Sequence, residues 1–259
     1  MPQPTYLDPS AYQADGGATG ALLIHGFTGS VAETRPMGEF LAEQGMTVHC
    51  PLLPGHGTTA EDLIQIGWQA WVDEVESAYR DLQGRCDVVF AGGLSMGAVL
   101  ALWLGAAHPE IAGLVVMAPG VKLQTRLLPL MPVVRRVLRY DPRGGIGDND
   151  LGDPEGKARI WCYDETPLWG AGELYYLQRR VNRSLADIHQ PILIVQGRRD
   201  AVVDARAPEF LYDAVSSADK EIVWLENSGH NLLVDGERQY VWQRSYAWMM
   251  ERSGQRTEA

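Results

Sequence analysis

Residues 88–102 read VVFAGGLSMGAVLAL, and this stretch decides the fold of the chain. An apolar, β-branched run leads to two glycines, one serine and a segment rich in small residues with helical character. The pattern predicts a strand, a sharp turn with Ser95 at its apex, and a helix. The turn, Gly93 to Gly97, fits the G-x-S-x-G pattern of a nucleophile elbow. An ordinary strand-to-helix turn has a similar pattern, so the rest of the chain must distinguish the two.

A nucleophile role for Ser95 would explain why glycines occur in this turn. A serine at so tight a turn has strained backbone angles, and side chains two residues to either side would collide with neighbouring elements. In return, the Ser95 Oγ stands clear of the backbone at a helix N-terminus, where developing negative charge is favoured.

Similar apolar runs occur on both sides of the elbow and alternate with helical patterns. Strands are predicted over 20–25, 46–50, 113–118, 191–196 and 221–225, and helices over 33–44, 68–82, 205–216 and 237–251. Continuously apolar strands that alternate with helices indicate a parallel sheet covered on both faces. Right-handed crossovers then give an α/β fold with a doubly wound, mostly parallel sheet.

The alternation stops between Val121 and Ala186. This part contains basic, proline-broken helical pieces over 127–139, a Gly/Asp-rich loop over 144–156 and a predicted helix over 168–181. We interpret it as an insertion that forms a helical cap over the carboxyl edge of the sheet. The predicted organisation is a core of residues 1–120 and 187–259 with a cap of residues 121–186.

Composition limits the classes of function. The chain has 259 residues, 46% of them hydrophobic, and can bury a large core. Its net charge of −11 argues against nucleic acid as a partner. Cys50, Cys86 and Cys162 lie far apart, which indicates inert thiols in a reducing compartment. There is no signal-peptide pattern and no apolar run near the ~18 residues of a membrane span. We expect a cytoplasmic protein without stable membrane insertion, monomeric or weakly homo-oligomeric.

A serine nucleophile needs a base, and three histidines follow Ser95 in the chain. His108 ends a helix in a His-Pro pair, and His189 precedes a strand. His230 lies after the last predicted strand, in a loop at the carboxyl edge of the sheet. His230 is therefore the candidate base.

The base needs an acid that fixes its tautomer. Asp200 directly follows a predicted strand and lies on the same edge as Ser95 and His230, in the chain order Ser, Asp, His. Asp204 is the competitor, but it precedes a predicted helix and suits an N-cap role. We favour Asp200.

Two backbone N–H groups must stabilise the oxyanion of the tetrahedral intermediate. One is that of Met96, the residue after the nucleophile. The other comes from the loop after the first predicted strand, where Phe27 is the natural donor. His25 ends that strand, and we expect it to shape the loop by hydrogen bonding rather than to act in catalysis.

These motifs together resemble the bacterial carboxylesterase and monoacylglycerol lipase family of the α/β-hydrolase superfamily. The matching segments are HGFTGS at 25–30, PGHG at 54–57, GLSMG at 93–97, Asp200, and SGH at 228–230. The resemblance implies a serine esterase with Ser95, Asp200 and His230 as its triad and the Phe27 and Met96 amides as its oxyanion hole. No metal or organic cofactor is expected, because these groups suffice for ester hydrolysis.

The resemblance extends more weakly to the cap. Ile146 and Asp164 resemble cap positions of the family, and Asp164 is a candidate hydrogen-bonding partner for a glycerol-like alcohol. A basic group surrounds apolar residues of the cap, namely Lys122, Arg126, Arg135, Arg136, Arg139 and Arg143. We favour a solvated basic face for these side chains, and the alternative is an entrance for anionic or interfacial substrates.

The expected function is therefore hydrolysis of short- to medium-chain carboxylic esters through an acyl-enzyme. Monoacylglycerol hydrolysis is the nearest alternative. A hydrolase-derived ligand-binding protein with little turnover is the alternative from another class, since fold alone does not determine activity. The partner in each case is a small molecule, an ester in the first two.

Overall fold

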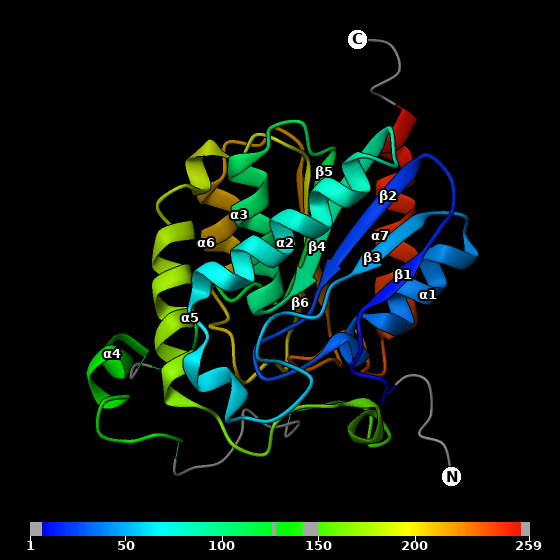
Figure 1. The fold of residues 1–259 in the computed structure, drawn as a ribbon. Coiled ribbons are helices and arrows are strands. Elements are labelled where there is room, and N and C mark those ends of the chain that lie inside the picture. The colour runs from blue at the N-terminus through cyan, green and yellow to red at the C-terminus, as the bar shows by residue number, and fades with distance from the viewer. Residues whose placement is uncertain (1–6, 126–127, 142–149, 255–259) are drawn as a thin grey trace.

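The structure of the protein is a computed structural model that describes residues 7–125, 128–141 and 150–254. Within these ranges the chain forms one sheet of seven strands in the order β1-β3-β2-β4-β5-β6-β7 (Figure 1). The strands are β1 (Tyr12–Ala14), β2 (Thr19–Ile24), β3 (Thr47–Cys50), β4 (Val88–Leu94), β5 (Gly113–Met117), β6 (Ile192–Gly197) and β7 (Lys220–Leu225). β1 pairs with β3 antiparallel, and the other neighbouring strands are parallel. The predicted α/β class with a mostly parallel sheet is confirmed.

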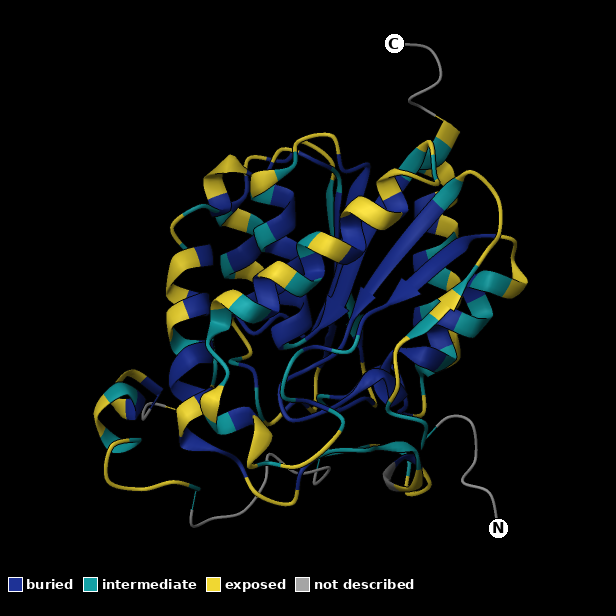
Figure 2. Cartoon of the chain, in the orientation of Figure 1, coloured by how far each residue is buried: buried dark blue, intermediate teal, exposed yellow. Residues whose placement is uncertain are grey.

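Helices cover both faces of the sheet. One face carries α1 (Arg35–Glu43) and α7 (Arg238–Ser253), and the other carries α2 (Trp68–Gln83), α3 (Met96–Ala107) and α6 (Ala207–Ala214) (Figure 1). Side chains of β6 alternate accordingly, with Ile192 and Ile194 in the core under α2 and α3. Figure 2 shows the central strands buried and the helices with one buried and one exposed side. This burial holds the strand ends, and hence the site, in fixed positions.

The first strand was not predicted. Tyr12–Ala14 pairs with His49 and its neighbours at the edge of the sheet. It has three residues and is partly exposed, so its sequence carries too short a pattern to stand out. The remaining strands agree with the predicted ranges to within one or two residues.

The chain leaves the sheet between β5 and β6. The described elements of this excursion are η4 (Leu128–Leu130), α4 (Met131–Val134), η5 (Gly156–Arg159), α5 (Leu168–Val181) and η6 (Leu185–Asp187). The described part of the helical pieces expected over 127–139 consists of η4 and α4. Pro129 lies within η4, and Pro132 lies in the first turn of α4, where a missing N–H is tolerated. α5 has the predicted bounds and packs against α2 and α3.

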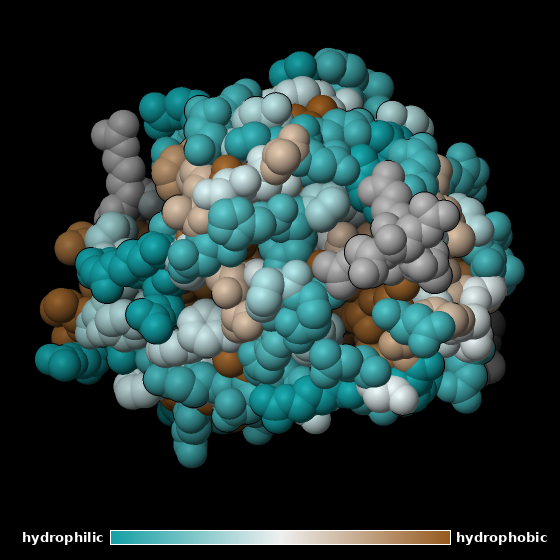
Figure 3. Space-filling view, turned by 90° about the horizontal axis from the view of Figure 1, so that it is seen from above, coloured by the Kyte–Doolittle hydropathy of each residue, from teal (hydrophilic) through white to brown (hydrophobic). Residues whose placement is uncertain are grey.

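Two further short 3-10 turns, η2 (Val31–Glu33) and η3 (Asp62–Gln65), lie in loops of the carboxyl edge. η4, α4, η5 and the start of α5 lie at this edge, at the bottom of Figure 1, and α5 runs from there toward the opposite end, where η6 leads into β6. The opposite end of the molecule, where the parallel strands begin, is mainly hydrophilic with small separate apolar patches (Figure 3). The hollows described below lie at the other end, because residues that follow the carboxyl ends of the strands line them.

Candidate active site

Ser95 lies at the sharp turn between β4 and α3, as predicted. Its backbone has φ 57° and ψ −110°, a left-handed conformation that is strained for a side-chain-bearing residue. The turn is held from both sides, because the Ser95 N–H donates to the Met117 carbonyl at 2.9 Å and the Ser95 carbonyl accepts from the Gly120 N–H at 3.2 Å.

The glycines of the elbow have the expected steric role. A Cβ at Gly93 would lie 2.7 Å from the Ile24 carbonyl oxygen, and a Cβ at Gly97 would collide with the same oxygen. β2 thus runs so close to the turn that only glycine fits at both positions.

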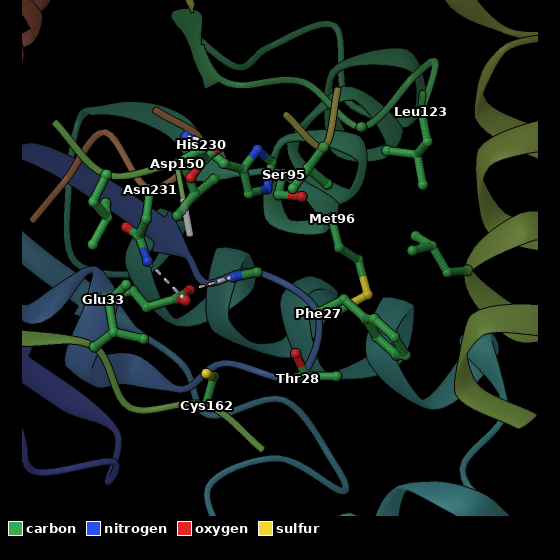
Figure 4. Close-up of a pocket in the computed structure, with 17 residues that line it drawn as sticks. Phe27, Thr28, Glu33, Ser95, Met96, Leu123, Asp150, Cys162, His230 and Asn231 are labelled. Atoms are coloured by element: carbon green, nitrogen blue, oxygen red, sulfur yellow. Dashed lines mark hydrogen bonds between the residues drawn. The ribbon is translucent and has the colours of Figure 1, made fainter. Parts of the chain in front are cut away.

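His230 and Asp200 meet at the same edge. The His230 Nδ1 is 2.9 Å from the Asp200 Oδ2, and the His230 ring points toward the Ser95 hydroxyl (Figure 4). Asp200 accepts three more hydrogen bonds, from the Gln196 Nε2 at 2.7 Å and from the Val202 and Val203 N–H groups at 2.8 Å each. Nδ1 therefore carries the proton toward the carboxylate, which leaves Nε2 as the basic nitrogen on the Ser95 side.

The electrostatics of this pair suit a general base. Burial opposes ionisation of Asp200, but the charge and hydrogen bond of His230 and the Val203 and Val202 N–H groups lower the pKa of Asp200. Burial alone would lower the pKa of His230, yet the carboxylates of Asp200, Asp150 and Glu33 raise it above its ordinary value. The site thus stabilises the imidazolium that forms when His230 accepts a proton.

The loop after β2, residues 25–30, is called here the oxyanion loop. It brings Phe27 next to Met96 in the lining of the pocket at Ser95 (Figure 4). Met96 is the first residue of α3, so its N–H has no acceptor within the helix. Thr28 has φ 65°, which turns the loop over the pocket, and its carbonyl accepts from the Tyr163 N–H at 3.0 Å.

His25 shapes this loop as expected. It is fully buried, its Nδ1 bonds the Gly26 carbonyl at 2.9 Å, and its Nε2 accepts from the Leu53 N–H at 3.1 Å. Burial lowers the pKa of His25 to about 4, so the ring is neutral at neutral pH. His56, from the PGHG segment, packs edge-on against His25 and Phe27. Both histidines support the loop and stay out of contact with the base.

The N-cap role expected of Asp204 is wrong, because α6 begins at Ala207 and its N-cap is Arg206, with no side-chain cap bond. The Asp204 Oδ1 accepts from the Arg206 N–H at 2.9 Å, just before α6, and the Asp204 side chain pairs with the Arg206 guanidinium. Asp204 therefore does not compete with Asp200.

The pocket at Ser95 has an apolar and a polar side (Figure 4). Phe27, Met96 and Leu123 form the apolar side, and Glu33, Asp150 and Asn231 lie beyond His230 on the other. A second cavity of about 210 Å³ continues from the apolar side, with Phe27, Leu123, Leu174 and Val202 in the lining of both. Leu128, Met131 and Leu168 of the cap close it.

The two cap residues suggested by the resemblance have different outcomes. Ile146 lies outside the described residues. Asp164 is exposed and is absent from the lining of both hollows, so the structure does not bring it to Ser95. Its place in the bend before α5 turns the side chain to solvent.

The basic cap face is partly neutralised rather than wholly solvated. Arg135 forms a 2.6 Å ion pair with Glu173, whose other oxygen accepts from the Trp68 N–H, and Arg135 also stacks on Trp169. Arg139 pairs with Glu61. These contacts fix α4 to α5 and to the start of α2. Arg126 and Arg143 lie outside the described residues.

Sequence reasoning missed several polar residues of the site. Glu33 and Asn231 are buried and hydrogen-bonded to each other at 3.1 Å, and Asp150 accepts from the His230 N–H at 3.1 Å. Asp150 belongs to the Gly/Asp-rich loop, and Asn231 immediately follows His230. The position of Asn231 next to His230 was the one sequence signal that could have indicated a site residue. No such signal marked Glu33.

Asp235 connects the cap to the loop that carries His230, residues 226–231, called here the histidine loop. Asp235 is fully buried and accepts hydrogen bonds from the N–H groups of Gly152, Asp153, Gly229 and Gly236, at 2.7 to 3.0 Å. Two of these donors belong to the cap excursion and one to the histidine loop. The position of His230 thus depends on contacts with both parts of the chain.

Among the described residues, no cluster of three or more His, Cys, Asp or Glu side chains is placed to hold a metal ion. No helix in the same ranges has the length and apolar character needed to cross a membrane.

Comparison with known proteins places these features in context. Residues 21–241 match the model of the alpha/beta hydrolase family. A thermostable monoacylglycerol lipase from Bacillus sp. strain H-257 is 34% identical over 97% of this chain and 98% of its own length. A carboxylesterase from Bacillus subtilis strain 168 is 31% identical over 94% of this chain and 97% of its own.

The fold comparison agrees. A solved structure from work on LipS and LipT, two metagenome-derived lipolytic enzymes, superposes with a TM-score of 0.89 at 31% identity. It covers 94% of this chain and 98% of the other. The likeness therefore includes both the sheet and the cap excursion.

Proposed function

This chain belongs to the alpha/beta hydrolase family and is a carboxylic ester hydrolase, and we propose that Ser95, Asp200 and His230 are its catalytic triad. The observation that carries the proposal is the 2.9 Å bond between His230 and Asp200, with the imidazole turned toward Ser95 at its strained turn (Figure 4).

In this proposal the reaction has two steps. The Ser95 Oγ attacks the ester carbonyl while the His230 Nε2 takes the proton of the Ser95 hydroxyl. The oxyanion that forms accepts hydrogen bonds from the Phe27 and Met96 N–H groups. His230 then gives the proton to the leaving alcohol, which departs and leaves an acyl group on Ser95. A water molecule, deprotonated by His230, attacks this acyl-enzyme. The bond to the Ser95 Oγ then breaks, His230 returns the proton to this oxygen, and the acid is released.

We further propose that the acyl groups are short to medium in length. The support is the apolar cavity of about 210 Å³ beyond Phe27, which is below the ~300–1,000 Å³ of pockets that bind drug-sized ligands. Monoacylglycerol hydrolysis is the second candidate. It is supported by the printed name of the Bacillus sp. relative and by the acceptor-rich polar side of the pocket.

Replacement of the nucleophile tests the triad. We expect Ser95→Ala to lower kcat for p-nitrophenyl butyrate by at least ~10³-fold with an unchanged thermal midpoint, because a nucleophile has no substitute in this mechanism. Ser77→Ala, an exposed serine of α2, is the matched control and should keep full activity. Equal rates for Ser95→Ala and wild type would refute the triad assignment.

A further inference from the structure

Glu33 is a buried carboxylate that the serine mechanism above leaves without a role. It ends the short turn η2, is 6% exposed, and lies in the lining of the pocket at Ser95 (Figure 4). Removing a carboxylate from water is costly, so a buried one requires partners or a function.

The partners of Glu33 come from two parts of the active site. Its Oε2 accepts from the Gly26 N–H at 2.9 Å, inside the oxyanion loop and one residue before Phe27. Its Oε1 accepts from the Asn231 Nδ2 at 3.1 Å, one residue after His230. Figure 4 shows both bonds as dashed lines that meet at the carboxylate. A single side chain therefore bridges the loop that carries the proposed oxyanion donor and the loop that carries the proposed base.

The oxyanion loop is shaped to receive this carboxylate. A Cβ at Gly29 would lie 2.6 Å from the Glu33 Oε2, so a side chain at position 29 would displace the carboxylate. A Cβ at Gly26 would lie 3.3 Å from the same oxygen and 3.6 Å from the Ser95 Cβ. The carboxylate thus sits just beneath the loop and close to the nucleophile.

Asn231 adds an independent sign that this bridge is polarised. Its Nδ2 donates to Glu33, whereas its Oδ1 is buried without a hydrogen-bond partner among the described residues. The amide thus donates to the carboxylate while its own oxygen makes no hydrogen bond. A negative charge on Glu33 strengthens the hydrogen bond from Nδ2 and so offsets the cost of the unpaired oxygen.

We infer that Glu33 is a positioning residue for catalysis, which ties the Phe27 amide of the oxyanion loop to the His230 loop and supplies a negative charge that stabilises the imidazolium. This inference rests on the proposed triad. It deepens that proposal because it names the group that fixes the position of the oxyanion donor relative to the base.

The charges around Glu33 determine how this role depends on pH. The other ionisable groups of this region are His230, Asp150, Asp200, His25, Arg35 and Cys162. Asp200 and Asp150 act on His230, Arg35 points away to Asp8 and Ser10, and His25 stays neutral. Cys162 lines the same pocket. His230 is the group whose charge interacts with Glu33. Burial raises the pKa of Glu33 to about 7, although the Gly26 N–H, the His230 charge and the Asn231 hydrogen bond each lower it.

Glu33→Gln removes the negative charge of residue 33 but keeps the shape of its side chain. After a flip of the Asn231 amide, the glutamine accepts from the Gly26 N–H and donates to the Asn231 Oδ1, so both bridges persist without the charge. We expect kcat for p-nitrophenyl butyrate to fall about 10-fold at pH 8 with KM nearly unchanged, because the lost interaction is strongest in the transition state. The acid limb of kcat/KM should move to lower pH by up to about one pH unit, since the pKa of His230 falls without the neighbouring carboxylate.

Glu33→Ala removes the bridge as well. We expect kcat to fall by about 10² or more, because the Phe27 N–H is then no longer held, and loss of one oxyanion donor costs on that order. If this variant fails to fold, Glu33→Gln still decides. Glu43→Gln, an exposed carboxyl of α1, is the matched control and should retain wild-type kcat and pH profile.

The outcomes separate the two proposals. A folded Glu33→Gln with wild-type kcat and an unmoved acid limb overturns the positioning role and leaves the triad intact. Retained activity in Ser95→Ala overturns the triad itself. Loss of kcat with a moved acid limb in Glu33→Gln, together with an inactive Ser95→Ala, supports both.

Discussion

The carboxyl group of Glu33 opposes stability wherever it is ionised in the folded protein. Burial raises its pKa from 4.5 to about 7, so the folded state binds a proton that the unfolded chain has already released between these values. A raised pKa means that the stability contribution is complete below pH 4.5 and is lost as the pH rises through 7. At 1.36 kcal/mol per pH unit, the loss is roughly 3 kcal/mol.

A stability measurement follows from this sign. Relative to wild type, Glu33→Gln should gain stability between pH 5 and pH 8.5, by up to roughly 3 kcal/mol, because glutamine does not titrate. Urea unfolding at the two pH values measures the difference. Asp200 is common to both proteins. The lower pKa of His230 in the variant acts in the same direction, because stability from a raised histidine pKa is also lost as the pH rises. A difference between variant and wild type that is the same at both pH values would contradict the buried, titrating carboxylate.

At the residue level, the sequence was sufficient to propose the triad but gave no sign of Glu33. Ser95, Asp200 and His230 each follow a recognisable strand in a fixed chain order, so local pattern was sufficient to propose them. Glu33 bonds residues 7 and 198 positions away, and its preceding sequence resembles an ordinary helix start. Only the folded chain brings its partners together.

The turn between β4 and α3 is the element most sensitive to substitution. Gly97→Ala places a methyl group against the Ile24 carbonyl of β2, which cannot move without breaking the sheet. We expect a fall in thermal midpoint of several degrees or loss of the folded protein, as for other overpacked sites.

Gly84→Ala provides the comparison for this prediction. Gly84 lies at the exposed end of α2, has φ −74°, and its added Cβ would have no contact nearer than 3.5 Å. Thermal unfolding of the two variants should therefore differ strongly. Equal thermal midpoints would show that close approach of β2 does not constrain the elbow.

The accuracy of predicted elements followed the strength of their patterns. α2 and α5 have long amphipathic or apolar runs, and their bounds were predicted to within a residue. The three-residue β1 gave no pattern, and the segment around α4 combined helix-forming residues with two prolines whose effect depends on packing. Tertiary contacts, such as the pairing of β1 with β3, determine structure where local pattern is weak.

At the scale of the whole molecule, the cavity proposed to take the acyl group is lined both by the core and by the excursion between β5 and β6. Ala171 of α5 lies in its wall, opposite residues of the core. Ala171→Leu should fill part of the cavity and shift preference toward shorter chains, so that the kcat/KM ratio of octanoyl to acetyl p-nitrophenyl esters falls about 10-fold or more.

The control for this prediction is Ala107→Leu at the exposed end of α3, which should leave the ratio unchanged. A chain-length series from acetyl to palmitoyl esters checks both variants. If wild type were fastest on palmitoyl esters, the proposed short- to medium-chain preference would be wrong.

The hydrogen bonds of Asp235 set a boundary for exchanging parts between relatives. A chimera that replaced residues 121–186 with the cap of another enzyme would discard the Gly152 and Asp153 N–H groups while keeping the carboxylate that they bind. It would also remove the Asp150 carboxylate that accepts from the His230 N–H. A chimera that keeps His230 in place therefore needs a donor cap that supplies these same three contacts. The segment to exchange is the cap together with the loops that contact His230 and Asp235.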